Sequence, residues 1–377
     1  MAVGDQAKLM TAIPLVDLRA AHAQVAAEIE AGFEEVMSST AFIKGEVAAA
    51  FERDYAAFTG VAHCVGVANG TDALELALRA AEVPAEAEVI MPANTFVATA
   101  EAVVRAGARP AFADVDPDYL LLDPEGLEAA LSQQTGAVVP VHLFGQMAPM
   151  AAIADVTAQR ATVIIEDAAQ AHGATQSGRP AGSFGLLAGV SFYPGKNLGA
   201  YGDAGAVLTE SAEHARRIRL LGDHGSERRY EHLTVGFNSR LDALQAVVLR
   251  AKLRGLAAGN QARRQAASRY AELLADLPEV ILPRTAPGNE HVWHLYAIRV
   301  PRRDDVLRFL HDEGIGAGIH YPVPVHLQPA FRHLGYGPGD FPVAEAAARQ
   351  LLSLPLYPQI TQEQQVRVAD AVRRALG

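Results

Sequence analysis

Between residues 60 and 170, short apolar runs alternate with longer segments of helical periodicity. The runs are rich in Val and Ile, show little polar alternation and lie at residues 64–68, 88–92, 110–114, 137–143 and 162–166. Strands without alternation are typical of a parallel sheet covered on both faces. The intervening segments have apolar residues near a 3.6-residue period and predict helices over 71–82, 95–107, 123–134 and 147–160. This order predicts an α/β layer fold with right-handed crossovers.

The alternation ends after Glu166, where a loop is expected over residues 167–187. Two further strands, 188–192 and 204–208, follow closely and are expected to pair in the same sheet. A long helical region over 240–277 then connects the sheet to the rest of the chain.

The C-terminal part predicts a second, smaller α/β unit. Its expected elements are a strand at 293–300, a helix at 303–314, an extended segment at 316–326 and a last helix from Thr361. We therefore expect a large domain over 1–245, with a mostly parallel central sheet, and a small domain over 246–377.

Composition excludes several classes of function. The net charge of −11 argues against a general nucleic-acid binder. The single cysteine, Cys64, rules out an internal disulfide and a cysteine-based zinc site, and it fits a reducing cytoplasm. We expect no signal peptide at the start of the sequence, and no apolar stretch reaches the roughly 20 residues of a membrane span.

In an open α/β sheet, ligands bind beyond the carboxyl ends of the strands. The first feature at such an end is "VANGTDALELAL", residues 67–78. Gly70 allows a tight turn, and Thr71 suits a helix N-terminus, where backbone N–H groups and the helix dipole attract anions. A capped helix without a ligand is the alternative.

The second feature is "EDAAQAHGA", which follows the buried run 162–166 directly. Asp167 is expected where the strand leaves the core, and a carboxylate there needs a cation, a metal or a protonated ring nitrogen as its partner. The spacing to His172 matches no common metal motif, so no metal is predicted. An acidic loop in water is the alternative.

The third feature is "SFYPGKNLGAYGDAG", residues 191–205. A Walker A motif is excluded, because five residues separate Gly189 from Gly195 and Asn197 replaces the required Ser or Thr. The strand instead brings Ser191 and Lys196 to the edge that carries Asp167. Such a lysine forms either a plain ion pair or a Schiff base with a carbonyl group.

Phe96 follows the predicted strand 88–92 and either lies against a planar ring or packs in the core. Taken together, the four features fit one ligand. It has a phosphate for the helix terminus and Ser191, a ring for Phe96, a ring nitrogen for Asp167 and an aldehyde for Lys196. Pyridoxal 5′-phosphate (PLP) has these parts.

The chain resembles the DegT/DnrJ/EryC1/StrS family of PLP-dependent nucleotide-sugar aminotransferases nearly from end to end. The shared motifs include "IPLVDLRA", "VGVANGTDALELAL", "PANTFVATAEAV", "VHLFGQMAPM", "IEDAAQAHGA", "SFYPGKNLGAYGDAGAV", "GFNSRLDALQAVVL" and "GIHYPVPVHLQPAF". The resemblance implies the PLP-dependent transferase fold type I, the aspartate aminotransferase fold.

The resemblance also implies roles for single residues. Lys196 corresponds to the lysine that binds the cofactor aldehyde and moves the substrate proton, and its presence favours transamination, because relatives that dehydrate sugars carry histidine there. Asp167 corresponds to the partner of the pyridine nitrogen and Gln170 to the partner of the ring hydroxyl. The remaining contacts implied are the phosphate ligands Gly70, Thr71 and Ser191 and the stacking residue Phe96.

In the family, the "GFNSRLD" segment comes from the neighbouring subunit, which implies a homodimer with shared active sites. Asn238 would reach the cofactor phosphate of that neighbour.

The implied reaction transfers an amino group from L-glutamate to a dTDP-linked 3-keto-6-deoxyhexose. "HGSERRYEHLTVGFNSRLD" and "GIHYPVPVHLQPAFRHLGY" are similar to the branch that aminates C-3. The alternatives are amination at C-4 and a PLP-binding regulatory protein of the same family. A nicotinamide oxidoreductase lacks support, since no G-x-G-x-x-G follows the first strand.

Four residues are weaker candidates for substrate binding. His320 and Tyr321 stand in the rigid "HYPVPVH" run and either line a sugar pocket or form a strand edge. His224 is expected in a loop near the nucleotide or in solvent. Arg228 either meets the substrate diphosphate or adds surface charge.

Overall fold

The computed structural model describes residues 12–158, 160 and 162–377. Most of the N-terminal stretch in which we expect no signal peptide, residues 1–11, lies outside the described residues. Within the described ranges, no helix is both long and apolar enough to cross a bilayer.

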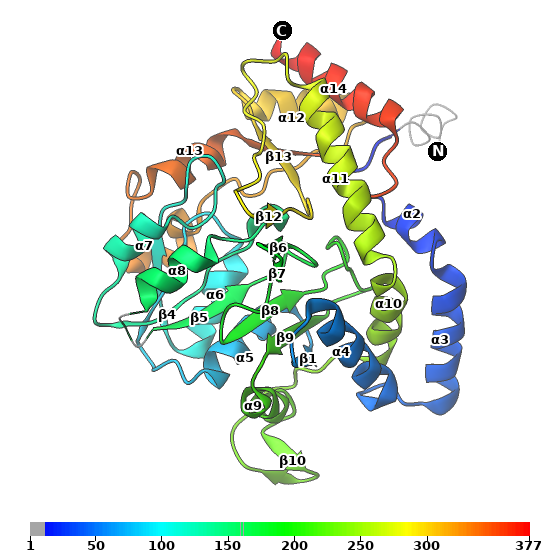
Figure 1. The fold of residues 1–377 in the computed structure, drawn as a ribbon, viewed down its shortest axis with the longest axis vertical. Helices are drawn as coiled ribbons and strands as arrows, with labels where there is room; N and C mark the ends of the chain where they lie inside the picture. Colours follow the sequence, from blue (N-terminus) through cyan, green and yellow to red (C-terminus); the bar gives the residue numbers. More distant parts are fainter. Residues whose placement is uncertain (1–11, 159, 161) are drawn as a thin grey trace.

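A seven-stranded sheet forms the centre of the molecule (Figure 1). The strand order is β1-β9-β8-β5-β4-β2-β3, and six strands share one direction while β9 is antiparallel to both neighbours. The strands are β1 (His63–Val67), β2 (Glu88–Pro92), β3 (Arg109–Ala113), β4 (Thr135–Val138), β5 (Val163–Asp167), β8 (Leu187–Ser191) and β9 (Gly205–Thr209). The predicted strands, their mostly parallel arrangement and the pairing of the last two are confirmed.

Helices cover both faces of this sheet, as the apolar strands require. One face carries α5 (Gly70–Ala80), α6 (Val97–Ala106) and α9 (Ala212–Gly222). The other face carries α4 (Gly45–Thr59), α7 (Pro124–Ala130), α8 (Met150–Thr157) and α10 (Ala243–Leu253). The four helices predicted between the strands are confirmed with shorter bounds. Gly107 ends α6 in the left-handed region, at φ +88°.

A second core lies beside the sheet and is built mainly from the C-terminal part of the chain. Its elements are α11 (Leu256–Leu273), α12 (Arg303–Asp312), α14 (Gln362–Leu376), β13 (Tyr296–Arg299) and β14 (Leu351–Leu354). The last helix begins at Thr361 as predicted, because Thr361 and Gln364 form a capping box. The expected helical region 240–277 is interrupted at Arg254–Gly255.

The division into a large domain over 1–245 and a small domain over 246–377 stays a prediction, because the core of the sheet also contains residues from the C-terminal part, such as Val325 and Phe341. Helix α10 packs against α4 and α3 (Ala26–Ser39) rather than in the second core. Helices α4 and α3 lie on either side of α10, and α2 (Leu18–Ala23) lies above α3 in the view of Figure 1.

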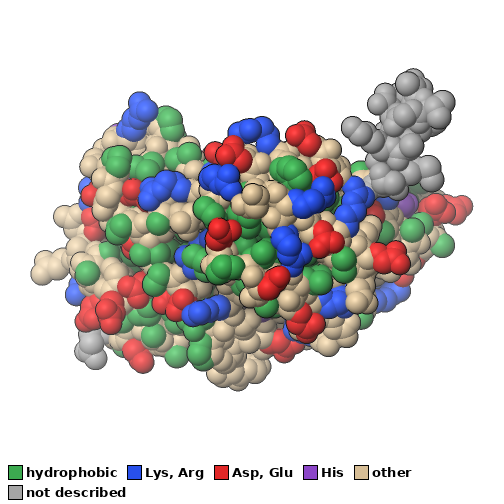
Figure 2. Space-filling model, turned by 90° about the horizontal axis from the view of Figure 1, so that it is seen from above, with side chains coloured by type: hydrophobic (Ala, Val, Ile, Leu, Met, Phe, Trp, Pro, Cys, Tyr) green, Lys and Arg blue, Asp and Glu red, His purple; other side chains and the backbone are tan. Residues whose placement is uncertain are grey.

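Acidic and basic side chains are interspersed over the face of the molecule seen in Figure 2. Over the surface as a whole, many charged side chains form ion pairs, such as Arg254 with Glu28 and Arg373 with Asp276. Neither sign gathers into one continuous patch on this face.

Helix α13 (Pro342–Gln350) connects the C-terminal part of the chain to the central sheet. Asp114, which follows β3 directly, accepts hydrogen bonds from the backbone N–H groups of Val343 and Ala344, both at 2.9 Å. Ala344 is also buried in the core of the sheet. The carboxylate therefore caps a helix that lies far from it in the sequence.

We expect Asp114→Ala to lower the free energy of unfolding by about 1–2 kcal/mol, the usual effect of removing a helix cap. Urea unfolding followed by circular dichroism measures the change. The matched control is Asp340→Ala, because the exposed Asp340 side chain accepts, within the described residues, a single backbone hydrogen bond from Gly337. An Asp114→Ala midpoint equal to that of the control would show that the cap does not stabilise the fold.

Candidate active site

A cleft of about 600 Å³ opens at the carboxyl ends of the parallel strands. Asp167 ends β5, Ser191 ends β8 and leads into the turn that carries Lys196, and Gly70 and Thr71 begin α5 after β1. All five residues line the cleft. The prediction that they meet at one edge of the sheet is confirmed, since parallel strands end at the same edge.

The first turn of α5 provides an anion site in the cleft wall. Asn69 caps the helix by accepting from Asp72 N–H at 2.8 Å, and no acceptor within the described residues binds the N–H groups of Gly70 and Thr71. A side chain on Gly70 would bring its Cβ to 2.6 Å from Ser191 Cβ, so only glycine allows the two segments this close. Free N–H groups, the helix dipole and the Ser191 hydroxyl fit a phosphate.

Asp167 is a buried carboxylate with one hydrogen-bond donor at each oxygen. Thr99 Oγ1 donates to Oδ2 at 2.8 Å, and the N–H of Ala169 donates to Oδ1 at 3.1 Å. Burial raises the pKa of Asp167, and these hydrogen bonds and Lys196 offset only part of the rise. The remaining hydrogen-bonding capacity of a carboxylate in such a setting fits a protonated ring nitrogen.

Lys196 lies in a turn closed by its own backbone N–H, which donates to Tyr193 O at 2.8 Å. Burial lowers the pKa of Lys196 to about 8, and the negative charge of Asp167 opposes this shift. Burial therefore outweighs the mutual attraction of the two groups. About one tenth of the amine is then neutral at pH 7 and able to attack a carbonyl carbon.

Gln170, Phe96 and Tyr321 form one wall of the cleft. Gln170 Oε1 accepts the N–H of Phe144 at 2.7 Å, and Nε2 donates to the Tyr321 hydroxyl at 3.2 Å. The second N–H of the amide has no partner in the described chain and fits a ring hydroxyl. Phe96 is 50% exposed and lies 5.3 Å from the Tyr321 ring, so it forms a wall of the cleft and is not part of the core.

His320 also lines the cleft, whereas three other predicted residues do not. His224 and Arg228 lie at or near the hairpin of β10 (Ser226–Arg228) and β11 (Glu231–His232), which projects from the lower end of the molecule (Figure 1). Asn238 lies in a neighbouring cavity. Within one chain these residues stay apart from Lys196, and their roles stay predictions.

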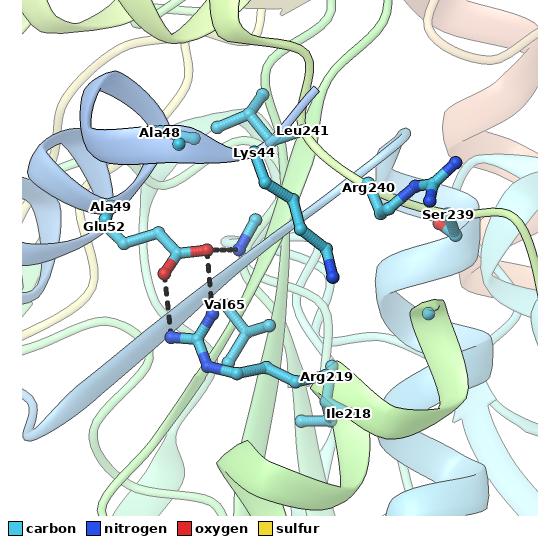
Figure 3. Close-up of a pocket in the computed structure, with 13 residues that line it drawn as sticks. Lys44, Ala48, Ala49, Glu52, Val65, Ile218, Arg219, Ser239, Arg240 and Leu241 are labelled. Carbon is cyan, nitrogen blue, oxygen red and sulfur yellow. Dashed lines mark hydrogen bonds and ion pairs between the residues drawn. The ribbon is translucent and has the colours of Figure 1, made fainter. Parts of the chain in front are cut away.

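A separate cavity of about 280 Å³ lies between β1, α4 and α9 (Figure 3). Its cations have partners within the chain. Arg219 pairs with Glu52, which also accepts the N–H of Gly66, while Lys44 and Arg240 both pair with Asp223. These internal pairs leave no free charge for an anionic ligand.

Several residues of the cleft were not predicted from the sequence. They include Leu15, Val16, Tyr193, Asp203, His294 and Leu295. Leu15 and Val16 stand in the shared motif "IPLVDLRA", but nothing in that motif indicates a role in the site, because they reach the cleft only through tertiary packing. For His294, the one available signal was a histidine in the "WHLYAIRV" run, which predicts only a strand. Within the described ranges, no group of His, Cys, Asp and Glu side chains is arranged to hold a metal ion.

A lysine with a lowered pKa, a buried carboxylate, an anion site and an aromatic wall meet in one cleft of an α/β sheet. This combination defines an enzyme that binds a phosphorylated aromatic aldehyde through a lysine.

Comparison with known proteins identifies the family. The profile of the DegT/DnrJ/EryC1/StrS aminotransferase family matches residues 23–373. A UDP-N-acetyl-3-dehydro-alpha-D-glucosamine 3-aminotransferase of Acidithiobacillus ferrooxidans is 47% identical, over 97% of this chain and 98% of that protein. A dTDP-3-amino-3,4,6-trideoxy-alpha-D-glucose transaminase of Streptomyces venezuelae is 44% identical, over 96% and 95%. A pleiotropic regulatory protein of Geobacillus stearothermophilus is also 44% identical, over 96% and 97%.

The crystal structure of S. venezuelae DesV superposes with a TM-score of 0.94 at 44% identity and covers 96% of this chain and 98% of that one. The chain belongs to the DegT/DnrJ/EryC1/StrS aminotransferase family. It is a PLP-dependent aminotransferase with the α/β fold of that family, and the predicted cofactor and fold class are confirmed.

Lys196→Ala should abolish the covalent attachment of PLP, because no other lysine of the described residues lines the cleft. The measurement is borohydride reduction of the protein with PLP, followed by peptide mass mapping. Lys44→Ala is the control, since Lys44 lies in the separate cavity and should leave the labelled peptide unchanged. Label retained by the Lys196→Ala protein at full stoichiometry would disprove the assignment.

The lowered pKa of Lys196 predicts how the rate of PLP attachment depends on pH. Only the neutral amine attacks, so the rate for the apoprotein should rise about fivefold from pH 7 to 8 and level off above pH 9, as expected for a pKa of about 8. Stopped-flow absorbance measures this rate. N-α-acetyl-lysine is the control, and its rate of reaction with PLP should continue to rise up to pH 10. An equally steep rise for the protein up to pH 10 would mean that the amine is not desolvated.

Proposed function

We propose that the protein transfers the amino group of L-glutamate to the keto carbon of a dTDP-linked 3-keto-6-deoxyhexose. The observation that carries the proposal is the Lys196–Asp167 site within a chain whose near relatives are named for reactions at C-3 of nucleotide-linked sugars. The nucleotide differs between those relatives, and the dTDP assignment follows the S. venezuelae protein.

The residues of the cleft have different roles in this reaction. PLP, when bound, supplies an aromatic ring that accepts electrons from the carbon that loses its proton. The N–H groups of Gly70 and Thr71 would hold its phosphate, and Asp167 would keep the ring nitrogen protonated. The neutral Nζ of Lys196 would be the base that takes a proton from glutamate, and its protonated form would be the acid that returns one to the sugar carbon.

We further propose that two copies of the chain share their active sites, with Asn238 of one copy at the phosphate site of the other. Asn238 is exposed and lines its cavity of about 380 Å³ together with Ile43 and Asp203, and Asp203 also lines the main cleft. Next to it, the apolar side chains of Phe42 and Ile43 are 45% and 49% exposed. A second copy would cover these side chains and bring its own Asn238 to the cleft.

Subunit mixing tests the shared sites. Lys196→Ala and Asn238→Asp proteins should each be inactive, the second because a carboxylate repels the phosphate. After unfolding and refolding together, about a quarter of wild-type activity should return, since half of the dimers would hold one intact site. The control is each variant refolded alone. A mixture no more active than the two variants alone would argue for sites confined to one chain.

The direct test of function is an incubation of the holoenzyme with L-glutamate and a dTDP-3-keto-6-deoxyhexose. Mass spectrometry should show a dTDP-amino sugar and 2-oxoglutarate in equal amounts. The matching 4-keto sugar tests amination at C-4. Absence of amino sugar from the 3-keto substrate, with product from the 4-keto substrate, would move the reaction to C-4.

A PLP-binding regulator is the second candidate, because the Geobacillus relative is named as a regulatory protein. Glutamate alone separates the two functions. An aminotransferase converts its cofactor to the pyridoxamine form, and the long-wavelength absorbance is lost. A protein that keeps this absorbance in saturating glutamate and in other amino acids would favour the regulator.

A further inference from the structure

His294 lies in the wall of the cleft, on the segment that leads into β13. It is 9% exposed and faces the same space as Lys196, His320 and Tyr321. None of the roles assigned above to the cofactor-binding residues uses this imidazole.

The hydrogen bonds around Asn197 determine which ring nitrogen of His294 carries the proton. Asn197 Nδ2 lies 2.9 Å from Val292 O and 3.0 Å from Asn260 Oδ1. Both are acceptors, because Asn260 uses its own Nδ2 to donate to His172 O at 2.8 Å. Asn197 therefore presents its oxygen to His294 Nδ1, at 3.3 Å. An amide oxygen only accepts, so Nδ1 carries the hydrogen.

The other ring nitrogen, Nε2, is then a hydrogen-bond acceptor. It has no recorded hydrogen-bond partner in the part of the chain that the structure describes. Burial lowers the pKa of His294 well below its ordinary value, and the nearby charges of Lys196 and Arg263 and the imidazoles of His172 and His320 act in the same direction. The imidazole is neutral at physiological pH and keeps its lone pair.

We propose that Nε2 of His294, held in this tautomer by Asn197, accepts a hydrogen bond from a hydroxyl group of the sugar substrate. The inference rests on the proposed function and names a substrate contact within it. A neutral nitrogen with a lone pair repels the carboxylates of glutamate and the diphosphate of the nucleotide. The hexose carries hydroxyl groups beside the keto carbon, which has to reach Lys196 in the same cleft, whereas the deoxyribose hydroxyl of the nucleotide lies beyond the diphosphate.

Two substitutions distinguish the roles of the two ring nitrogens. In His294→Asn, the amide reaches the position of Nδ1, keeps the contact with Asn197 and lacks an acceptor at Nε2. In His294→Gln, the amide oxygen reaches the position of Nε2 and restores the acceptor. Loss of sugar affinity in His294→Asn and its recovery in His294→Gln is a pattern that a general loss of packing would not give.

We expect His294→Asn to weaken the binding of the keto sugar and to leave the reaction with glutamate unchanged. His294→Asn should raise the KM for the keto sugar about tenfold, the equivalent of about 1.4 kcal/mol. The rate at which glutamate bleaches the cofactor absorbance should stay within twofold of wild type. His294→Gln should recover most of the sugar affinity. Equal losses with glutamate and with the sugar, or no loss with either, would overturn the inference.

Calorimetry provides a readout that does not depend on turnover. A dTDP-3-amino-3,6-dideoxyhexose titrated into the PLP-loaded protein should bind about tenfold more weakly to His294→Asn than to wild type. Equal binding to the two proteins would overturn the inference alone. Wild-type protein that reacts with glutamate but does not bind the amino sugar would overturn the proposed substrate and this inference together.

Discussion

The presence of an amine and a carboxylate in one cleft, both withdrawn from water, is the constraint on which the site depends. In water, Lys196 and Asp167 would both be charged. In the cleft, burial lowers the pKa of Lys196 and raises that of Asp167 despite their attraction. Desolvation raises the neutral fraction of the lysine to about one tenth at pH 7, which makes an amine available to bond to carbon, and it leaves the carboxylate in need of a cationic partner.

The fold creates this pair by ending β5 and β8 at the same edge and by anchoring the turn after β8. Asn197, the residue after Lys196, bonds to Asn260 on α11 and to the backbone of Val292. The reactive lysine is therefore held by the connector helix and by the segment that leads into the second core. This arrangement makes the geometry of the site depend on how the two cores pack.

The pattern of apolar residues was sufficient to predict the sheet and the residues that follow the carboxyl ends of its strands, because both depend on the local sequence. The helices α2, α3, α4 and α13 were not predicted. The α13 cap is Asp114, more than 200 residues away in the sequence, and α3 is stabilised by packing on α10. His294 was missed for the same reason, since its role depends on hydrogen bonds to Asn197 that no spacing in the sequence reveals.

The most direct test of the account is the protonation state of the cofactor ring in the assembled protein. A ¹⁵N NMR spectrum of protein reconstituted with ring-labelled PLP reports it without turnover. At pH 8 the pyridine nitrogen should be protonated in the wild type and unprotonated in Asp167→Asn, because only a carboxylate stabilises the ring cation in this buried site. An unprotonated ring in the wild type, or the same spectrum in both proteins, would contradict the account.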